Sequence, residues 1–155
     1  MNGVAAAPEC FTAYEEMKMR KTDKFIVFKL SDDLRQIEVE KRGGSDASFE
    51  DFVAAMPPGE CRYVVLSLSV TTKSGATDPH RLLFVSWCHD DSRTKAKMMH
   101  ASSKSALKKG LSGLSEEFCA SSHDDLTFEE LYLKSGGVPP CVPPPAAGSR
   151  GAYVA

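Results

Sequence analysis

Two strongly apolar runs in the middle of the chain place the tightest limit on how it can fold. They are CRYVVLSLSV (Cys61 to Val70) and RLLFVSW (Arg81 to Trp87), and each has the length and the β-branched and aromatic content of a strand. The connector TTKSGATDPH is rich in Gly, Thr, Asp and Pro, which is typical of a turn. We therefore predict two paired strands joined by a mobile hairpin loop.

The flanking segments predict a second hairpin and three short helices. KFIVFKL (Lys24 to Leu30) and RQIEVEK (Arg35 to Lys41) form the hairpin, and the second of these strands is half exposed. PECFTAYEEMKMR (Pro8 to Arg20) has the apolar spacing of an amphipathic helix. Helices are also expected over SFEDFVAAM (Ser48 to Met56), which opens on a capping serine, and over TFEELYL (Thr127 to Leu133).

A change of period from Ser102 onward predicts one longer helix of about four to five turns. Ser102 or Ser103 is suited to cap its start, and two glycines are expected to weaken or bend its middle. Its apolar stripe is Leu107, Leu111, Leu114 and Phe118, and its glycines are Gly110 and Gly113.

Strands flanked by helices predict an α/β (α+β) fold, with a mixed sheet and a helix layer on each face. A chain of 155 residues fits a single domain with one sizeable core. We assign the domain to residues 1–134. Residues 135–155 are rich in Gly and Pro, so this tail is expected to be disordered.

Cysteine spacing and the absence of long apolar segments bear on the compartment. No window approaches 18 uncharged apolar residues, and no basic segment followed by an apolar run opens the chain. The five cysteines have no C-x-x-C spacing, which argues against a zinc site or a disulfide framework. We expect a cytoplasmic protein with reduced thiols and no cofactor.

One basic segment stands out from an acidic chain. From Ser92 to Ser115 there are six Lys and Arg residues and no acid, whereas the whole chain has a net charge of -2. The remaining residues together therefore carry -8. Such asymmetry usually concerns a partner, although a plain solvated helix face is the alternative.

Enzymatic chemistry has little support in the sequence. Ser105 and Lys108 have an S-x-x-K spacing, but the S-D-N and K-T-G elements that accompany it in acyl enzymes are missing. The runs His89-Asp90-Asp91 and His123-Asp124-Asp125 lack a specific metal-ligand spacing and are interpreted as solvated turns. We expect no enzyme and no metal site.

Nucleotide and nucleic-acid binding are also disfavoured. No phosphate-binding glycine motif occurs, and the basic segment contains no Phe, Tyr or Trp on which bases could stack. The P-x-x-P spacing at Pro140 and Pro143 has no flanking Arg, so a disordered extension is preferred to a recognition motif.

The segment KAKMMHASSKSALKKGLSGL (Lys95 to Leu114) resembles the signature of the actin-depolymerising factor/cofilin family. The stretches WCHDDSRTKAKMM, MKMRKTDKFIVFKL, SFEDFVAAMP and ECRYVV extend the resemblance over residues 3–134. The resemblance implies a five-stranded mixed sheet between helices, in a monomer that binds actin monomers and promotes filament depolymerisation, severing and turnover. It also implies a place in the actin cytoskeleton.

The resemblance further implies a set of contact residues. For the actin monomer these are Gly3, Val4, Lys95, Lys97, Met98, Ser103, Lys104, Leu107 and Lys108, of which Lys95, Lys97 and Met98 are expected just before the long helix. Met98 is the expected central anchor, because a flexible thioether adapts to an apolar cleft, and its alternative is a place in the core.

The sequence also departs from the family at three places. Asn2 replaces the phosphorylatable serine of many relatives, and His100 replaces a tyrosine. For the filament surface only Arg81 and Lys134 remain as basic candidates, beside Glu129 and Glu130. We therefore expect weakened filament binding. The alternatives on the same fold are phosphoinositide binding through Lys95 to Lys109 and regulation of another actin-related assembly.

Overall fold

A six-stranded mixed sheet forms the centre of the protein in the computed structural model, which describes residues 4–21 and 23–139. The strand order is β1-β3-β2-β4-β5-β6, with β1 and β6 parallel to their neighbours and the inner pairs antiparallel. The strands are β1 (Ala5–Ala6), β2 (Phe25–Leu30), β3 (Gln36–Gly43), β4 (Cys61–Thr71), β5 (Thr77–Cys88) and β6 (Glu116–Ala120). The mixed sheet is confirmed, but the implied five strands are corrected to six.

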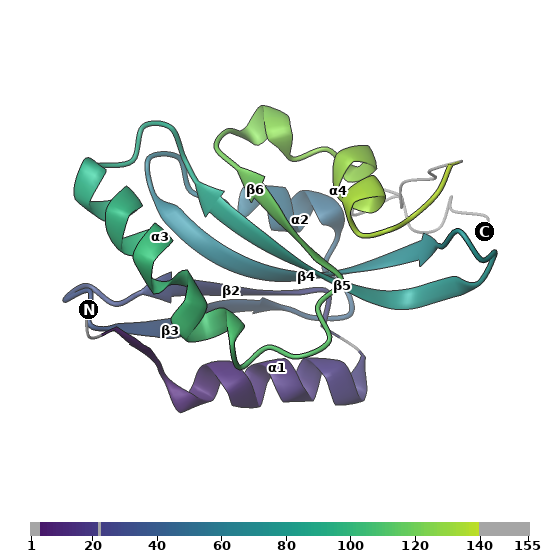
Figure 1. Cartoon of the computed structure of the whole chain (residues 1–155), viewed down its shortest axis with the longest axis horizontal. Coiled ribbons are helices and arrows are strands. Elements are labelled where there is room, and N and C mark those ends of the chain that lie inside the picture. The colour runs from purple at the N-terminus through teal and green to yellow at the C-terminus, as the bar shows by residue number, and fades with distance from the viewer. Residues whose placement is uncertain (1–3, 22, 140–155) are drawn as a thin grey trace.

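Two pairs of helices cover the two faces of the sheet (Figure 1). One face packs against α1 (Pro8–Arg20) and α3 (Thr94–Lys108). The opposite face packs against α2 (Phe49–Ala54) and α4 (Phe128–Lys134). A short 3₁₀ turn, His123–Asp125, precedes α4. The predicted helix layer on each face is therefore confirmed.

Burial on both faces explains why the inner strands are apolar without interruption. Along β2, Phe25 and Val27 enter the core beneath α2 and α4, whereas Ile26 and Phe28 enter the core beneath α1 and α3. All four side chains are fully buried. Each buried side chain of this size contributes about 1.5–3 kcal/mol relative to an exposed one, so the central strands contribute much of the stability of the domain.

Local capping signals place three helices where the sequence predicted them. The helix α1 has Pro8 in its first turn and ends at Arg20, after which Lys21 takes the left-handed conformation, with φ 56°. Ser48 and Asp51 form a reciprocal capping box at the start of α2. The Thr127 side chain accepts a hydrogen bond from the backbone N–H of Glu130 and so caps α4.

The predicted start of the long helix is wrong. It begins at Thr94 and not at Ser102, so Lys95, Lys97 and Met98 lie within its first turns. Ser103 is 1% exposed in the middle of the helix and faces the core, which leaves no role for it as a cap. The first two turns of α3 have no aliphatic stripe, because the side chain that they bury is the polar His100. The spacing of apolar residues therefore does not mark this part of the helix.

The predicted end of the long helix is also wrong, because α3 stops at Lys108. A Cβ atom on Gly110 would lie 2.2 Å from the Phe11 ring of α1, so a side chain there would have to displace this ring. Gly113 has φ +90°, which turns the chain toward β6. Leu111 stays in the core beneath α1 and α3, but Phe118 lies on β6 and packs against the opposite core.

The predicted hairpin loop is shorter than expected. The strand β4 continues to Thr71 and β5 begins at Thr77, so half of the Gly/Pro-rich connector belongs to the two strands. The hairpin extends well beyond the rest of the sheet (Figure 1). Its far end carries a short turn, closed by a hydrogen bond from the Thr72 N–H to the Ala76 carbonyl.

The predicted tail begins too early, because residues 135–139 pack on the β4–β5 hairpin. The Ser135 side chain is buried, and its carbonyl accepts a hydrogen bond from Arg81 Nε at 2.8 Å. The Val138 N–H donates to the Thr71 carbonyl at 2.9 Å, and the Tyr132 hydroxyl donates to the Val138 carbonyl at 2.9 Å. The remainder of the expected tail, residues 140–155, lies outside the described residues.

A chain that ends at Lys134 should therefore be about 1–2 kcal/mol less stable than one that ends at Pro139, because two or three partly buried hydrogen bonds are lost. Urea unfolding of the two truncated chains measures the difference. Equal midpoints and slopes would show that residues 135–139 contribute nothing to stability.

Candidate functional site

The N-terminal half of α3 combines an exposed apolar side chain with two lysines. Met98 is 65% exposed, and Lys95 one turn earlier is also exposed. Lys97 is half-buried, because its Nζ donates a 2.8 Å hydrogen bond to the Asp90 carbonyl in the loop before the helix. We call Lys95, Lys97 and Met98 the α3 surface. Met98 is therefore exposed, as a contact residue must be, and the alternative that it lies in the core is wrong.

Hydrogen bonds hold the loop that leads into α3. The Ser92 N–H donates to the His89 carbonyl at 2.9 Å, and the Asp90 N–H donates to the Ser121 carbonyl at 2.9 Å. Ser92 itself is buried. Since this loop is bonded to the chain after β6 and to Lys97, the first turn of α3 is fixed relative to the sheet.

A buried histidine fixes the underside of the helix. The His100 ring stacks on Tyr63 with centroids 4.2 Å apart, and its Nε2 lies 2.9 Å from Ser86 Oγ. The Tyr63 hydroxyl donates a 2.6 Å hydrogen bond to the His100 carbonyl. Burial, with a smaller effect of nearby Lys104, lowers the pKa of His100 to about 4, so the ring is neutral at pH 7.

Two of the predicted contact residues also face inward. Ser103 is 1% exposed and Leu107 is fully buried in the core beneath α1 and α3. Their side chains therefore anchor the helix and are covered by the fold. The next residue after each of them, Lys104 and Lys108, is only half-buried and stays accessible.

One acidic residue from β6 binds both lysines on the second half of the helix. Glu117 forms ion pairs of 2.6 Å with Lys104 and with Lys108 (35% or less side-chain exposure for each partner). Burial by itself would raise the pKa of Glu117, but the two lysine hydrogen bonds outweigh it and lower the pKa to about 2. The basic segment is therefore partly neutralised, and its free positive charge is concentrated toward the start of α3.

Sequence reasoning missed Glu117 because it placed this residue on the helix. The strand is only five residues long, and its sequence EEFCA has no polar/apolar alternation that would have marked it as a strand. Once β6 lies beside β5 in the parallel register, Glu117 is opposite Phe84 and within reach of α3.

The chain before α1 lies next to α3. Val4 is partly buried against the core beneath α1 and α3, and β1 follows it directly. The β1 strand pairs in parallel with β3 through Ala5 and Ala6. Val4 is thus brought toward the α3 side of the molecule, whereas Gly3 lies outside the described residues.

The two basic residues predicted for a filament surface lie near the β4–β5 hairpin and at the end of α4. Arg81 has partners within the protein: its Nε donates a hydrogen bond to the Ser135 carbonyl, and its Nη1 lies 3.6 Å from Asp78 Oδ2. Lys134 is exposed in the last turn of α4. Glu129 and Glu130 are exposed in the first turn of the same helix.

The residues considered for catalysis or metal binding lie at the surface or form structural contacts. Ser105 is exposed, while Lys108 Nζ is bound to Glu117. His123 Nε2 lies 2.9 Å from the Met56 carbonyl. Within residues 4–21 and 23–139, no cluster of three His, Cys, Asp or Glu side chains is arranged to hold a metal ion. None of the helices in those ranges has the length and apolar character needed to span a membrane.

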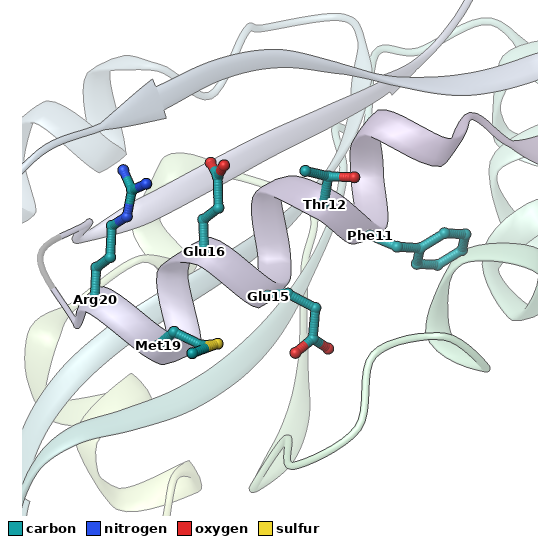
Figure 2. A pocket seen from close by; sticks show the side chains of 6 residues that line it. All are labelled: Phe11, Thr12, Glu15, Glu16, Met19 and Arg20. Carbon is teal, nitrogen blue, oxygen red and sulfur yellow. The ribbon is translucent and has the colours of Figure 1, made fainter.

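A surface hollow on α1 does not add a ligand site. It is lined by six residues of that one helix, Phe11, Thr12, Glu15, Glu16, Met19 and Arg20 (Figure 2). Glu16 and Arg20 project to one side of the helix, and Met19 and Glu15 project to the other (Figure 2). Because no second element forms an opposing wall, the hollow cannot enclose a small molecule.

Comparison with known proteins agrees with this arrangement. A family model described as cofilin/tropomyosin-type actin-binding protein matches residues 3–135. Actin-depolymerizing factor 1 of Petunia hybrida is 37% identical over 134 residues, which cover 86% of this chain and 96% of that protein. Cofilin of Mycosarcoma maydis is 35% identical over 133 residues, with coverage of 86% and 94%.

A solved structure shows the same fold. The crystal structure of Streptomyces griseoflavus cofilin has a TM-score of 0.77 and 32% sequence identity, covering 86% of this chain and 97% of that chain. The mixed sheet between two helix pairs therefore defines a single-domain protein of the cofilin fold. The chain belongs to the cofilin/actin-depolymerising factor family.

Proposed function

We propose that this protein binds actin monomers through the α3 surface and promotes the disassembly of actin filaments. The observation that carries the proposal is the exposure of Met98, directly after Lys95 and Lys97, at the start of a helix that hydrogen bonds fix to the sheet. Family membership and the names of the relatives support actin as the partner.

The chemistry of the α3 surface suits an apolar cleft with an acidic rim. A standard interface buries about 1,600 Å² and has an apolar centre with a charged border. Met98 supplies a flexible apolar centre, and Lys95 and Lys97 supply positive charge beside it. Val4 extends the surface on the side of β1, while Ser103 and Leu107 support it from beneath.

Lys104 and Lys108 belong to the border of this surface. Their ion pairs with Glu117 hold both ammonium groups in fixed positions, which reduces the side-chain entropy lost on binding. The same pairs reduce their attraction for an acidic partner. We therefore assign the main electrostatic contribution to Lys95 and Lys97.

Phosphoinositide head groups fit the segment Lys95 to Lys109 less well than actin does. Two of its lysines are already bound to Glu117, and Met98 would place an exposed apolar side chain beside the phosphates. The protein is expected to act by binding, as a monomer in the actin cytoskeleton, with no catalytic step.

Disassembly of pyrene-labelled filaments, measured beside a titration of monomeric actin, tests the function. The protein should accelerate the loss of fluorescence after dilution and should bind monomers in the same buffer. Absence of both effects would contradict the proposal.

The exposed acids of α4 predict that filaments bind more weakly than monomers. The family's second, filament-side surface would include Arg81 and Lys134, but Arg81 is held by Ser135, and Glu129 and Glu130 would face an acidic partner. Replacement by Glu129→Lys/Glu130→Lys should strengthen filament co-sedimentation about threefold and leave monomer affinity unchanged. Stoichiometric filament decoration by the unmodified protein, as tight as its monomer binding, would refute this assignment.

A further inference from the structure

Two cysteines face each other at one end of the central hairpin. Cys61 opens β4 and Cys88 closes β5, and the two residues are directly opposite in the antiparallel register. Their sulfur atoms are 3.4 Å apart, and both side chains are partly buried free thiols. The residues are 27 positions apart in the sequence, so the spacing of cysteines gave no sign of the pair.

The backbone pattern makes this pair suitable for a covalent link. The His89 N–H points to the Glu60 carbonyl at 3.4 Å, so residues 60 and 89 form a hydrogen-bonded position of the ladder. Cys61 and Cys88 therefore occupy the neighbouring non-hydrogen-bonded position, where opposite Cα atoms are about 4.5 Å apart. That separation lies inside the range of about 4.4–6.8 Å that disulfides require.

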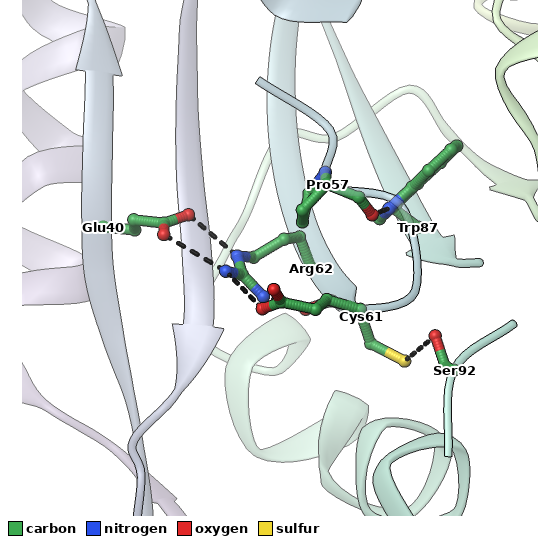
Figure 3. Close-up of polar contacts among 7 residues, drawn as sticks. Glu40, Pro57, Cys61, Arg62, Trp87 and Ser92 are labelled. Atoms are coloured by element: carbon green, nitrogen blue, oxygen red, sulfur yellow. Dashed lines mark hydrogen bonds and ion pairs between the residues drawn. The ribbon is translucent and has the colours of Figure 1, made fainter. Parts of the chain in front are cut away.

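The surroundings hold both backbones in place (Figure 3). Arg62 donates from Nη1 to the Cys61 carbonyl at 2.8 Å and binds the carboxylates of Glu40 and Glu60. Trp87, next to Cys88, donates from Nε1 to the Pro57 carbonyl at 2.9 Å. Only side-chain rotation is needed to bring the sulfurs about 1.4 Å closer, to the length of a disulfide.

We propose that Cys61 and Cys88 form a reversible intramolecular disulfide, with glutathione disulfide as the oxidant. The Cys61 thiolate attacks one sulfur of glutathione disulfide and releases one glutathione thiolate. Cys88 then loses its proton and attacks the Cys61 sulfur, which releases the second glutathione. Two protein thiols are oxidised, and one glutathione disulfide is reduced to two molecules of glutathione.

The order of the two attacks follows from the environment of Cys88. Burial raises the pKa of Cys88 to about 11, with a smaller contribution from the neighbouring Cys61 thiol, so the Cys88 thiolate is scarce at pH 7. Cys88 is therefore the resolving thiol, which reacts once the first sulfur is activated and held beside it. Cys61 Sγ also lies 3.6 Å from Ser92 Oγ, so the disulfide would form beneath the loop that leads into α3 (Figure 3).

The test uses the full chain with Cys119→Ser and Cys141→Ser, which removes an exposed thiol and the cysteine beyond residue 139. The protein is equilibrated in glutathione buffers of increasing oxidation, and free thiols are alkylated before peptide mass spectrometry. We expect a Cys61–Cys88 cross-linked peptide that dithiothreitol reverses, in a monomeric chain. The oxidised form should melt at least about 5 °C higher, since a long loop is closed.

The matched variant Cys88→Ser should stop at a mixed disulfide between Cys61 and glutathione, with no such rise in melting temperature. The proposal is overturned if Cys61 and Cys88 of the parent remain alkylatable across the range, if only mixed disulfides accumulate, or if cross-links join separate chains. None of these measurements involves actin, so their outcome is independent of the proposed function.

Discussion

Acidification from pH 7 to pH 4.5 should destabilise the protein by about 2 kcal/mol through His100 alone. The pKa of this residue is about 4 in the folded state, against 6.5 for an unperturbed histidine. The unfolded chain therefore binds the proton first, and stability is lost as the pH falls below 6.5. The loss is complete near pH 4, where the folded protein also binds the proton.

The groups around His100 account for the direction of this effect. The ring is 3% exposed between Tyr63 and Ser86, so a charge there would lose its hydration. Lys104 opposes the charge further, and Glu117 favours it to a smaller extent. The lowered pKa of Glu117, about 2, removes stability mainly below pH 4.5, so its contribution between pH 7 and pH 4.5 is small beside that of His100.

Urea unfolding of the native protein and of His100→Phe at pH 7 and at pH 4.5 measures the contribution. The phenyl ring keeps the stacking on Tyr63 and cannot be protonated, although Ser86 loses its partner, so the variant is less stable at pH 7. Its loss of stability between the two pH values should be about 2 kcal/mol smaller than that of the native protein. A residual loss is expected, because burial also lowers the pKa of His80. Equal losses in both proteins would contradict the assignment to His100.

The parts of the fold that the sequence predicted are those with local signals. Pro8 and the amphipathic spacing after it define α1 with its observed bounds, and Ser48 with Asp51 defines the start of α2. The apolar runs at the centre predict β4 and β5 because both of their faces are buried. In each case the information lies within about a dozen neighbouring residues.

The parts that sequence reasoning missed depend on contacts between distant segments. The strands β1 and β6 pair in parallel with segments far away in the chain, and each is short. Phe118 falls at a helical spacing from Leu107 by coincidence, since the turn at Gly113 sends it to the other face of the sheet. The anchoring of Ser135 by Arg81 likewise joins residues 54 positions apart.

The candidate site was predicted in composition but not in detail. Lysines and Met98 were identified, whereas their place on the first turns of α3 was not. The inward orientation of Ser103 and Leu107 depends on where the helix begins, which the buried His100 conceals. The ion pairs of Glu117 with Lys104 and Lys108 depend on the parallel placement of β6.

Replacement of both lysines of the α3 surface should weaken actin-monomer binding at least tenfold, a loss of about 1.4 kcal/mol or more. Lys95 is exposed in the first turn of α3, and Lys97 follows it on a helix fixed by its bond to Asp90. At an interface these charges lose water, and truncation of a desolvated charge costs about 2–5 kcal/mol. Adding Met98→Ser removes the apolar centre and should bring the loss to about a hundredfold.

The folded state should tolerate all three changes. Met98 is 65% exposed, and neither lysine has an ion pair within the described residues. Among the described residues the changes remove the Lys97 hydrogen bond to the Asp90 carbonyl, and an exposed hydrogen bond of this type contributes about 1 kcal/mol or less. Thermal unfolding of each variant is therefore the control for intact folding.

A second control separates local contact from net charge. Lys41→Ala/Lys73→Ala removes the same charge from exposed positions on β3 and at the tip of the β4–β5 hairpin, away from α3. Long-range attraction between the protein and an acidic partner depends on total charge. Any loss of actin affinity in this variant therefore measures the part of the effect that comes from net charge alone. This net-charge contribution to the loss of affinity should be small at physiological ionic strength, where charges are screened beyond about 8 Å.

The central claim is that the α3 surface binds monomeric actin, and calorimetric titration of monomeric actin with four proteins tests it most directly. These are the native protein, Lys95→Ala/Lys97→Ala, the same pair with Met98→Ser, and Lys41→Ala/Lys73→Ala. The account predicts Kd values raised at least tenfold and about a hundredfold for the two α3 variants, with the control within about twofold of the native protein. Native-like affinity in the triple α3 variant, with its fold intact, would contradict it.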